Sequence, residues 1–517
     1  MTVYPETKQI VIPYRADIEH ILRAPVAQRF QHQGAWWLAV EHSVVAVRLL
    51  KNLGLTVPSP ALSYYDFCGG EPFESQRTTV DLCTTSRRAY VLSEMGVGKT
   101  RAVLWAFDYL RHERLANKLL VVAPLSTLVT VWENEIFDNF HHLKSVVLYG
   151  DRKKRAKLLA AEADIYIINF DGVGVLHQEL WARPDINVVI IDEVASYRNS
   201  RIERWKQLQP LVKRAEYAWG LSGAVTPNAP TDAYGIAKLL TPETVGFSFK
   251  DFQSRTMRQV APFKWVAREE APNIVHATLQ PAVRFTRKEC LDLPPTSYIT
   301  MSCDPGAVAT KAYKQMFDCY AAEMRGHEIT AANAAVKVSK LLQVSAGFMY
   351  DNFGRAVFVG GADRCRQIIE VIEQAEGKVI VFAAFRYMVE VISGVLAKKY
   401  NVCKVHGDVP KAERDIIFSN FQRNPEPRVL VGHPGCMSHG LTLTAASTVI
   451  WATPTTSHEQ YQQACARITR SGQQRNTLIV HIAATRAEEV AYARLRTRGN
   501  LQDSILDLFE TNTRGMP

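Results

Sequence analysis

The chain of 517 residues is too long for a single hydrophobic core, and its length predicts about two to four domains. Its composition, 47% hydrophobic and 22% charged, is typical of a soluble globular protein, and no run of about eighteen apolar residues is present to span a membrane. The net charge of +10 favours a polyanionic partner such as nucleic acid.

The nine cysteines are scattered singly along the chain. No pair has the spacing of metal ligands, and an odd, dispersed set does not suit a disulfide framework. The N-terminus lacks the basic and then apolar profile of a signal peptide. We therefore expect the thiols to be core side chains in a reducing compartment, and the protein to be cytoplasmic.

The first predicted elements form a segment of about seventy residues. Residues 18–23 and 41–55 have the apolar spacing of helices, and residues 35–40 between them have the pattern of a strand. Trp36 and Trp37 are adjacent on that strand, so one side chain should be buried and the other exposed. An exposed tryptophan could stack on an unpaired base, although packing inside a small accessory domain explains the pair equally well.

From residue 89 onward, short apolar runs rich in β-branched residues alternate with amphipathic helical segments, and the pattern occurs twice. It predicts two α/β layers, each built on a parallel sheet covered on both faces. The predicted strands of the first set are 89–93, 119–124, 164–170 and 187–193, and those of the second set are 378–385, 401–407, 428–433, 447–453 and 477–483.

A less regular stretch, roughly residues 241–350, separates the two sets. Residues 292–297 contain paired prolines that suit a linker, and residues 332–344 have the spacing of a helix. We expect this stretch to connect the two layers, and the sequence assigns it no further function.

A candidate phosphate-binding loop, Ser-Glu-Met-Gly-Val-Gly-Lys-Thr, occupies residues 93–100 between a predicted strand and a predicted helix. The usual pattern has a glycine where this chain has Ser93, so the loop is ambiguous on its own. The order of strand, loop and helix suits phosphate binding, because it points backbone N–H groups at the phosphates. Lys99 would then reach the β- and γ-phosphates, and Thr100 would hold Mg²⁺.

Two adjacent carboxylates, Asp192 and Glu193, follow a buried strand, where ligands bind in open α/β sheets. One can hold Mg²⁺ while the other orients or deprotonates the attacking water. The alternative is an acidic residue pair that favours the start of a helix.

Two basic clusters are candidates for phosphate recognition. Arg467 and Arg470 are three residues apart, so on a helix they would share a face and could stabilise charge on a transferring phosphoryl group. Such a pair more often forms a solvated face. The basic run at 151–157 could contact DNA, but a solvated surface is the better explanation.

Several segments, taken in order, resemble the motifs of Swi/Snf-type ATPases of helicase superfamily two, in the short form found in phages and prophages. The loop at 93–100 resembles the first motif of that family, in which the position of Ser93 is not glycine either. Residues 463–473, Gln-Ala-Cys-Ala-Arg-Ile-Thr-Arg-Ser-Gly-Gln, match the sixth motif at each fixed position. The other segments that resemble family motifs are 72–79, 121–136, 190–199, 221–235, 405–422 and 438–454.

The resemblance implies two lobes that close on ATP and Mg²⁺ while bound to DNA. Catalytic roles are implied for Lys99, Asp192, Glu193, Arg467 and Arg470. ATP binding is implied for Gln76, which would read the adenine, and for Met95, Gly96, Val97, Gly98, Lys99, Thr100 and Gly440. Mg²⁺ binding is implied for Thr100 and Asp192, and DNA contact for Pro124, Ser126 and Thr442.

Three departures from the family pattern bear on coupling. Motif II has Val194-Ala195 where Ala or Gly followed by His is usual, and that histidine commonly couples hydrolysis to the nucleic-acid site. Motif III has Gly223-Ala224-Val225 in place of Gly-Thr-Pro, and Thr442 stands at a usual Asn position in motif V. The sequence therefore does not show how hydrolysis would be coupled to DNA binding, whereas both carboxylates of motif II are present.

The N-terminal segment resembles, more weakly, the HARP module of annealing helicases through its order of helix, turn, tryptophan-bearing strand and helix. We therefore predict an α/β fold of two tandem RecA-like parallel-sheet lobes with a helical connecting region and a small α+β accessory domain. The expected domains are residues 1–68 (accessory), 69–290 (first lobe, with a helical extension from about 241) and 291–517 (second lobe).

The resemblance implies an ATP-dependent motor that translocates on duplex or branched DNA without sequence specificity and remodels it by branch migration, fork regression or strand annealing. Such a motor would act as a monomer in the cytoplasm of a bacterial host, in DNA repair or replication, beside phage or host replication and recombination proteins. Two alternatives remain open: the motor subunit of a restriction or defence complex, and a DNA-binding clamp with little turnover.

Overall fold

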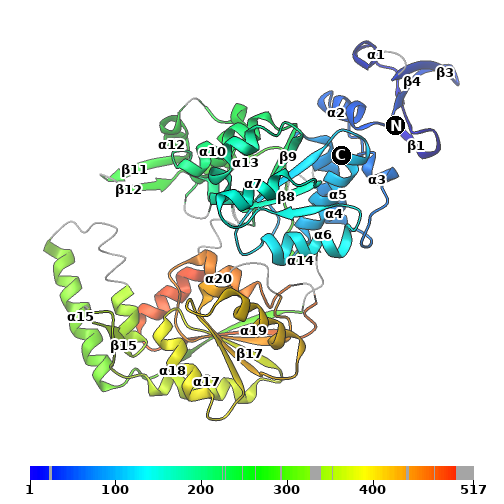
Figure 1. Ribbon diagram of the computed structural model, residues 1–517. Coiled ribbons are helices and arrows are strands. Elements are labelled where there is room, and N and C mark those ends of the chain that lie inside the picture. Colours follow the sequence, from blue (N-terminus) through cyan, green and yellow to red (C-terminus); the bar gives the residue numbers. More distant parts are fainter. Residues whose placement is uncertain are drawn as a thin grey trace. The chain divides into compact units, whose positions relative to one another are not determined.

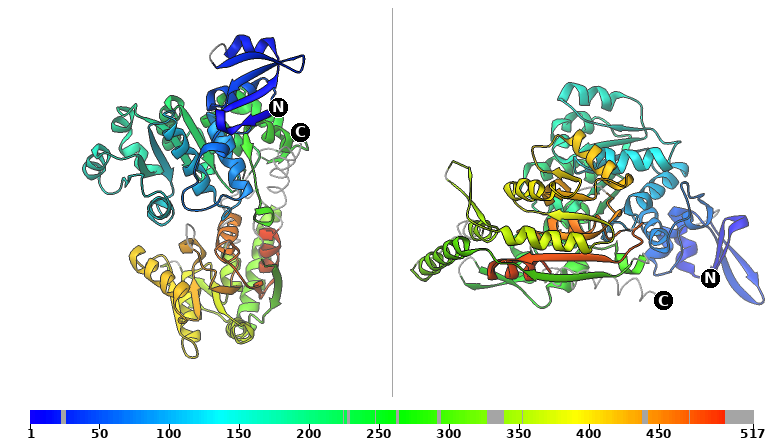
Figure 2. Two further views of the ribbon diagram at one scale, coloured as in Figure 1. Left: turned by 90° about the vertical axis from the view of Figure 1, so that its right-hand side faces the viewer. Right: turned by 90° about the horizontal axis from the view of Figure 1, so that it is seen from below.

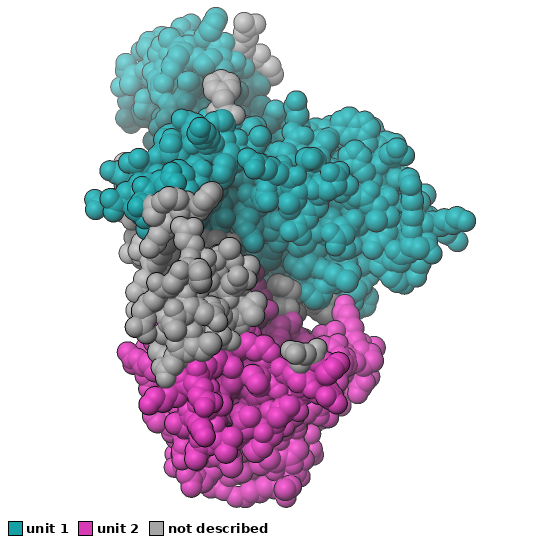
Figure 3. All heavy atoms as spheres, turned by 90° about the vertical axis from the view of Figure 1, so that its left-hand side faces the viewer, with its two compact units in different colours: residues 1–290, 502–517 teal, residues 291–501 magenta. Residues whose placement is uncertain are grey.

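The computed structural model forms two compact units, unit 1 built on Met1–Cys290 and unit 2 on Leu291–Leu501 (Figures 1 and 3). Among the residues that the structure describes, no helix is long and apolar enough to cross a membrane. The described residues are 1–22, 26–223, 225–226, 229–246, 248–261, 264–290, 294–326, 339–351, 353–437, 442–470 and 472–496.

Unit 1 begins with an antiparallel sheet of strand order β1-β2-β4-β3, which packs with α1 and α2. Its core contains Leu38 and Val40 of β4, Ile18 of α1 and Leu50 of α2, all buried. The bounds are β1 Thr2–Tyr4, η1 Pro5–Thr7, β2 Gln9–Pro13, α1 Ala16–Leu22, β3 Ala27–His32, β4 Ala35–Glu41 and α2 Val44–Asn52.

The two neighbouring tryptophans differ in exposure, but neither is fully buried as the alternation along β4 predicts for one of them. Trp36 is 50% exposed, and Trp37 is only partly exposed. The guanidinium of Arg29 lies over the Trp36 ring, 5.2 Å from its centre, so an aromatic and a cationic group meet at this surface.

The main sheet of unit 1 has seven parallel strands in the order β13-β5-β10-β9-β6-β8-β7. Alternate residues of each inner strand enter the core on opposite faces; in β9, Val189 and Ile191 join one cluster while Val188 and Ile190 join the other. The strands are β5 Arg88–Val91, β6 Lys118–Ala123, β7 Ser145–Val147, β8 Ile165–Asn169, β9 Ile186–Asp192, β10 Tyr217–Leu221 and β13 Ala282–Val283.

Helices cover both faces of this sheet (Figure 1). Their bounds are α3 Ala61–Tyr64, α4 Glu74–Thr85, α5 Lys99–His112, η2 Leu128–Glu133, α6 Asn134–Asn139, α7 Arg152–Ala160, α8 Phe170–Val175, α9 His177–Trp181, η3 Val194–Tyr197, α10 Glu203–Arg214, α11 Asp232–Leu240, η4 Pro242–Thr244, α12 Phe249–Thr256, α13 Ala271–Thr278 and α14 Arg287–Cys290.

The stretch after residue 241 does more than connect. Its hairpin, β11 Met257–Ala261 and β12 Lys264–Ala267, is followed by α13 and then by β13, which adds an edge strand beside β5. Backbone N–H groups of Tyr90, Leu92 and Glu94 donate to carbonyls of this returning segment at 2.8–3.0 Å. The returning segment therefore braces both β5 and the loop that follows it.

Unit 2 is built on a second parallel sheet, with strand order β14-β21-β20-β17-β19-β18. Figure 2 shows its first and last strands, β14 and β21, side by side. The strands are β14 Thr296–Ser302, β17 Lys378–Phe382, β18 Val402–Val405, β19 Val429–Gly432, β20 Ala446–Trp451 and β21 Thr477–Ala483, and a separate hairpin pairs β15 Phe348–Tyr350 with β16 Ala356–Phe358.

Helices alternate with most of the strands of unit 2, as the alternating pattern of the sequence predicts. Of the predicted helix 332–344, residues 332–338 lie outside the described part, and residues 339–345 are helical. The bounds are α15 Ala307–Gly326, α17 Ala362–Gln374, α18 Arg386–Leu396, α19 Lys411–Arg423, η5 Pro434–Met437 and α20 His458–Cys465, and residues 486–496 are also helical.

A buried ion pair fastens the end of unit 2 to its sheet. Arg364 of α17 and Glu488 are both fully buried, and the guanidinium contacts both carboxylate oxygens at 2.8 and 3.0 Å. The same guanidinium donates to the carbonyls of Ser345, Ala452 and Ile482. One side chain thereby joins three helices and the carboxyl ends of two strands, and these acceptors stabilise its buried charge.

A buried histidine of unit 2 gives a pH dependence. His481 of β21 stacks on Tyr492 with ring centres 4.4 Å apart, and its Nε2 lies 2.8 Å from the hydroxyl of Tyr461. Burial lowers the pKa of His481 to about 4. In the unfolded chain a histidine has a pKa of about 6.5, so on acidification the unfolded state binds the proton first.

The free energy of unfolding should therefore fall as the pH drops from about 6.5 towards 4, by about 2 kcal/mol at pH 5 from this residue alone. Urea denaturation at pH 7.5 and pH 5 measures the difference. His481→Gln should lose most of this dependence while keeping a polar partner for Tyr461. If the variant and the wild type lost equal stability on acidification, the contribution of His481 would be ruled out.

Candidate nucleotide site

The predicted site residues of unit 1 lie at the carboxyl edge of its parallel sheet. Four neighbouring strands, β5, β10, β9 and β6, end there, and each is followed by one of the motif segments. The phosphate loop follows β5, Ser222 follows β10, Asp192 ends β9, and Pro124 follows β6. Parallel strands thus bring together side chains that are far apart in the sequence, at the edge where α/β sheets bind ligands.

The predicted adenine-reading residue lies against the phosphate loop. Gln76 of α4 is buried, its Nε2 donates to the carbonyl of Gly98 at 3.2 Å, and its Oε1 accepts from the backbone N–H of Phe73. Gly96 and Gly98 both have left-handed backbones, with φ of 88° and 78°. A Cβ on Gly98 would lie 2.3 Å from the Gln76 amide nitrogen, so glycine is required there on two counts.

Lys99 begins α5 at the mouth of the loop. Its ammonium donates to the carbonyls of Ser93 and Glu94 at 2.6 and 2.9 Å, which holds the charge within the loop. Ser93 stands where the usual pattern has glycine; it is buried, and its hydroxyl accepts from the backbone N–H of Phe285 at 3.0 Å. The serine thus links the loop to the segment that follows β13. Thr100 is the second residue of α5, beside Lys99.

Asp192 ends β9 and receives a hydrogen bond from a buried tryptophan. The indole N–H of Trp132, in η2, donates to Asp192 Oδ2 at 3.0 Å. Burial raises the pKa of Asp192, while this hydrogen bond and the positive charge of Lys99 act in the opposite direction. The lysine and the carboxylate therefore lie close enough to influence one another, as a phosphate and metal site requires.

Glu193 has a strained backbone and a hydroxyl partner. Its φ and ψ are both 55°, the left-handed region that non-glycine residues rarely adopt and that clusters at functional sites. Ser222, which follows β10 in the third motif, donates to Glu193 Oε2 at 3.4 Å. A carboxylate at the end of a central strand, held by these constraints, suits a group that must act on a water molecule.

The third motif also touches the phosphate loop. A Cβ on Gly223 would lie within 3.8 Å of the side chain of Met95 and the carbonyl of Ser93, so these segments are neighbours. Val97, another predicted ATP-binding residue, is buried at the turn of the loop. Ala224 of this motif and Gly440, the ATP-binding residue predicted in motif V, lie outside the described residues.

The predicted DNA contacts differ in exposure. Pro124 is buried, so its side chain is not available to DNA, and its carbonyl accepts from Thr127 within a tight turn. Ser126 is partly exposed, and its neighbour Leu125 is 60% exposed. In unit 2, Thr442 is exposed. In the turn after β6, DNA could therefore contact the exposed tip around Leu125 and Ser126 but not the side chain of Pro124.

Arg467 and Arg470 lie in the turn that follows α20, and the prediction that they share a helix face is wrong. The side chain of Gln473 explains the turn, because its Nε2 donates to the carbonyls of Ala446 and Ile468 at 2.8 and 3.2 Å. Arg467 is buried and Arg470 is partly exposed. A turn can still present both guanidinium groups, but its own contacts, not helical spacing, set their direction.

The basic run at 151–157 lies mostly in α7 and has protein partners. Arg152 pairs with Glu179 at 3.0 Å, and Arg155 donates to the carbonyls of Leu148 and Gly150. These contacts support the interpretation of this run as a structural, solvated face rather than a DNA site.

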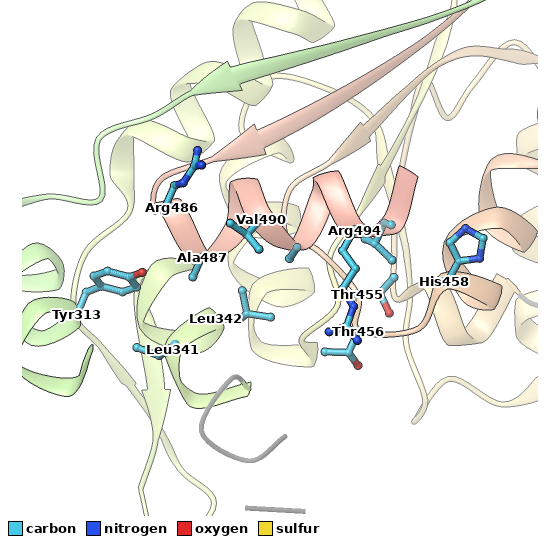
Figure 4. Close-up of a pocket in the computed structure, with 12 residues that line it drawn as sticks. Tyr313, Leu341, Leu342, Thr455, Thr456, His458, Arg486, Ala487, Val490 and Arg494 are labelled. Atoms are coloured by element: carbon cyan, nitrogen blue, oxygen red, sulfur yellow. The ribbon is translucent and has the colours of Figure 1, made fainter. Parts of the chain in front are cut away.

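Unit 2 has a hollow of about 610 Å³ (Figure 4). Apolar side chains such as Leu342 and Val490 line it, together with Arg486 and Arg494. None of the described residues that line it carries a carboxylate, so they provide no acid–base pair for hydrolysis. The edge of unit 1 is therefore the better candidate for chemistry.

The groups at that edge fit a nucleoside triphosphate with Mg²⁺. The loop offers backbone N–H groups and two glycines that permit close approach, Lys99 supplies positive charge, and Thr100 and Asp192 supply oxygen ligands of the kind Mg²⁺ prefers. Trp132 and Ser222, which contact the two carboxylates, are functional residues that spacing alone does not identify. Both follow strands next to β9, and that adjacency is the only available indication.

Two family models match this chain. Residues 30–352 match the family model of the SNF2-related domain, and residues 363–472 match the Helicase conserved C-terminal domain. Putative protein p41 of Acyrthosiphon pisum secondary endosymbiont phage 1 is 25% identical over 457 residues, which cover 82% of this chain and 95% of the phage protein.

Two larger relatives come from animals. SWI/SNF-related matrix-associated actin-dependent regulator of chromatin subfamily A-like protein 1 of Drosophila melanogaster is 24% identical, over 80% of this chain and 52% of that protein. DNA annealing helicase and endonuclease ZRANB3 of Bos taurus is also 24% identical, over 74% of this chain and 35% of that protein. The chain thus spans about half or less of their lengths.

The match to the first family model covers more than half of the chain and contains Lys99, Asp192 and Glu193. The second match covers the segment of Arg467 and Arg470. With its two parallel-sheet lobes, the chain belongs to the SNF2-related family, the Swi/Snf-type DNA-dependent ATPases of helicase superfamily two.

Proposed function

We propose that the protein is an ATP-driven motor that translocates on duplex or branched DNA and remodels it by branch migration, fork regression or strand annealing. The observation that carries this proposal is the arrangement of Lys99, Asp192 and Glu193 at one sheet edge. A clamp without turnover has no use for a glutamate held in a strained backbone and bonded to Ser222, so the arrangement supports hydrolysis.

In the proposed mechanism each side chain of unit 1 has one task. Backbone N–H groups of the loop and Lys99 bind the phosphates, and Gln76 reads the adenine. Asp192 and Thr100 would hold Mg²⁺, whose charge would neutralise the phosphoryl group being transferred. Glu193 orients the attacking water and accepts its proton.

Arg467 and Arg470 of unit 2 would complete the transition-state site. Guanidinium groups form short, charge-assisted hydrogen bonds to phosphoryl oxygens, and two of them spread the developing charge. Because these groups belong to the other unit, hydrolysis would depend on closure of the two lobes. Each cycle of closing and opening would then advance the protein along DNA.

The proposed DNA contacts are to phosphates, at the turn containing Ser126 and at Thr442. The net charge of +10 supports a backbone-directed, sequence-independent interaction that weakens with salt. The accessory domain, residues 1–68, would favour branched DNA through the exposed Trp36 and its neighbour Arg29. The phage relative supports action in the cytoplasm of a bacterial host.

ATP hydrolysis by the full chain, measured with single-stranded, linear duplex, forked and four-way DNA of equal nucleotide content, tests this function. We expect branched DNA to stimulate hydrolysis more than linear duplex, and both more than single strands. Equal stimulation by branched and linear duplex would exclude the remodelling preference and leave a general translocase. Lack of stimulation by every DNA would contradict the motor itself.

A further inference from the structure

A hydrogen-bonded route leads from the tip of the turn after β6 into the site. Both the backbone N–H and the hydroxyl of Thr127 donate to the carbonyl of Pro124 at 2.9 Å. The carbonyl of Thr127 in turn accepts from the backbone N–H groups of Val131 and Trp132, each at 3.1 Å. These four hydrogen bonds tie the position of Trp132 to the turn that carries Ser126.

The turn continues as a π-helix rather than an α-helix. The bond from Trp132 back to Thr127 spans five residues, the spacing of a π-helical turn, and η2 runs over Leu128–Glu133. Such turns are rare and are frequent at functional sites, because they redirect a side chain that regular helical spacing would point elsewhere. Here the redirected side chain is Trp132.

Trp132 is fully buried and ends on a carboxylate. Its relative exposure is 0%, it packs in one of the two core clusters of the main sheet of unit 1, and its indole N–H donates to Asp192 Oδ2 at 3.0 Å. Close-packed side chains transmit displacement because they have no room to absorb it. A shift of the turn therefore moves the indole, and with it the carboxylate predicted to hold Mg²⁺.

The surface end of the route is exposed. Leu125 is 60% exposed and Val129 is 41% exposed, one on each side of the buried Thr127. Ser126 lies between Leu125 and Thr127 and is partly exposed. A DNA strand held at this tip would thus press on the same turn whose carbonyls fix the indole.

We propose that Trp132 is the positioning residue through which DNA contact at the Ser126 turn reaches the metal-binding carboxylate Asp192. The inference rests on the proposed function. Motif II of this chain has Val194-Ala195 and lacks the usual histidine. The route through Trp132 would replace the coupling that this histidine commonly provides. Ala195, which stands at the position of that histidine, has only a methyl side chain and provides no polar group for that task.

Trp132→Phe keeps an aromatic ring in the core and removes only the indole N–H. We expect the Mg²⁺ concentration for half-maximal hydrolysis to rise about tenfold, which is typical for loss of a hydrogen-bond partner of a metal ligand. We also expect the ratio of DNA-stimulated to basal kcat to fall about tenfold, within the usual range of coupling between two sites. Basal kcat at saturating Mg²⁺ should change less than either.

A readout independent of turnover is equilibrium binding of a fluorescent ADP analogue, titrated with Mg²⁺ in the presence and absence of duplex DNA. In the wild type, DNA should lower the Mg²⁺ concentration needed for tight binding, and Trp132→Phe should abolish that shift. Thermal melting of the same samples reports folding.

Trp105→Phe is the matched control. Trp105 lies in the same core cluster and is equally buried, and its indole N–H donates to the carbonyl of Cys68 at 2.8 Å instead of to a site carboxylate. Trp105→Phe should lose about as much stability as Trp132→Phe but keep the wild-type Mg²⁺ dependence and DNA stimulation.

Thr127→Val, which removes only the hydroxyl bond to Pro124, should lower DNA stimulation without changing the Mg²⁺ dependence of the basal reaction.

The outcomes separate the two claims. A wild type that hydrolyses ATP without any response to DNA would overturn the proposed function and this inference with it. A wild type that responds to DNA, with Trp132→Phe equal to Trp105→Phe in both readouts, would overturn the inference alone. A raised Mg²⁺ requirement with full DNA stimulation in Trp132→Phe would also overturn it, since the indole would then serve the carboxylate without carrying the DNA signal.

Discussion

Arg470→Ala is expected to lower kcat for DNA-stimulated ATP hydrolysis by about 10³–10⁵-fold, the loss typical of an arginine that stabilises a transferring phosphoryl group. ATP binding should change far less, because the guanidinium acts on charge that develops in the transition state. Arg470 is the better target of the pair, since Arg467 is buried and its removal would disturb unit 2. Steady-state and single-turnover hydrolysis at saturating duplex DNA measure the effect.

Two variants control this experiment. Arg470→Lys keeps a positive charge but loses the planar set of donors, so it should recover little activity. Arg475→Ala removes an exposed guanidinium from the same loop and should leave turnover unchanged. Wild-type turnover in Arg470→Ala would show that this residue of unit 2 supplies no catalytic group.

Glu193→Gln is expected to lower kcat by about 10²–10⁴-fold, because an amide cannot accept the proton of the attacking water. Nucleotide should still bind, since Lys99 and the phosphate loop are intact. Lys99→Ala affects the binding step that precedes hydrolysis, so it should weaken binding of the nucleotide phosphates. The double variant should show no hydrolysis above background, measured as phosphate release alongside equilibrium binding of a fluorescent ATP analogue.

Glu203→Gln is a suitable control for the carboxylate. Glu203 is an exposed residue at the start of α10, and its nearest cationic partner, Lys206, is 3.9 Å away. Its loss should not affect turnover. Residual DNA-stimulated hydrolysis in Lys99→Ala/Glu193→Gln that exceeds a mock preparation would refute the assignment of both residues.

The strands of both sheets are predictable where they are long apolar runs, as β9 and β20 are. β10 lies near the centre of its sheet, but it contains no β-branched residue and has a glycine and an alanine, so its sequence does not identify it. β13 has only two residues and no periodicity, and β14 follows paired prolines that suggest a linker. Tertiary pairing, not local preference, makes strands of these segments.

Some residues of the candidate site can likewise be predicted from local sequence, and others cannot. Lys99 and Asp192 are predictable, because a loop before a helix and an acid after a strand are local patterns. Their partners Trp132 and Ser222 are not, since the contacts exist only because β6 and β10 flank β9. The helix face expected for the arginine pair fails for a similar reason: Gln473 donates both to the carbonyl of Ile468 in the same turn and to that of Ala446, which is distant in the sequence.

The order of strands in unit 2 has a consequence for synthesis of the chain on the ribosome. β14, the first strand of the unit, lies at an edge and pairs with β21, the last. During translation, β14 therefore leaves the ribosome first and stays without its partner strand β21 until nearly the whole unit has been made. A product truncated before residue 477 would leave β20 with an unpaired edge, which is the kind of surface that templates aggregation.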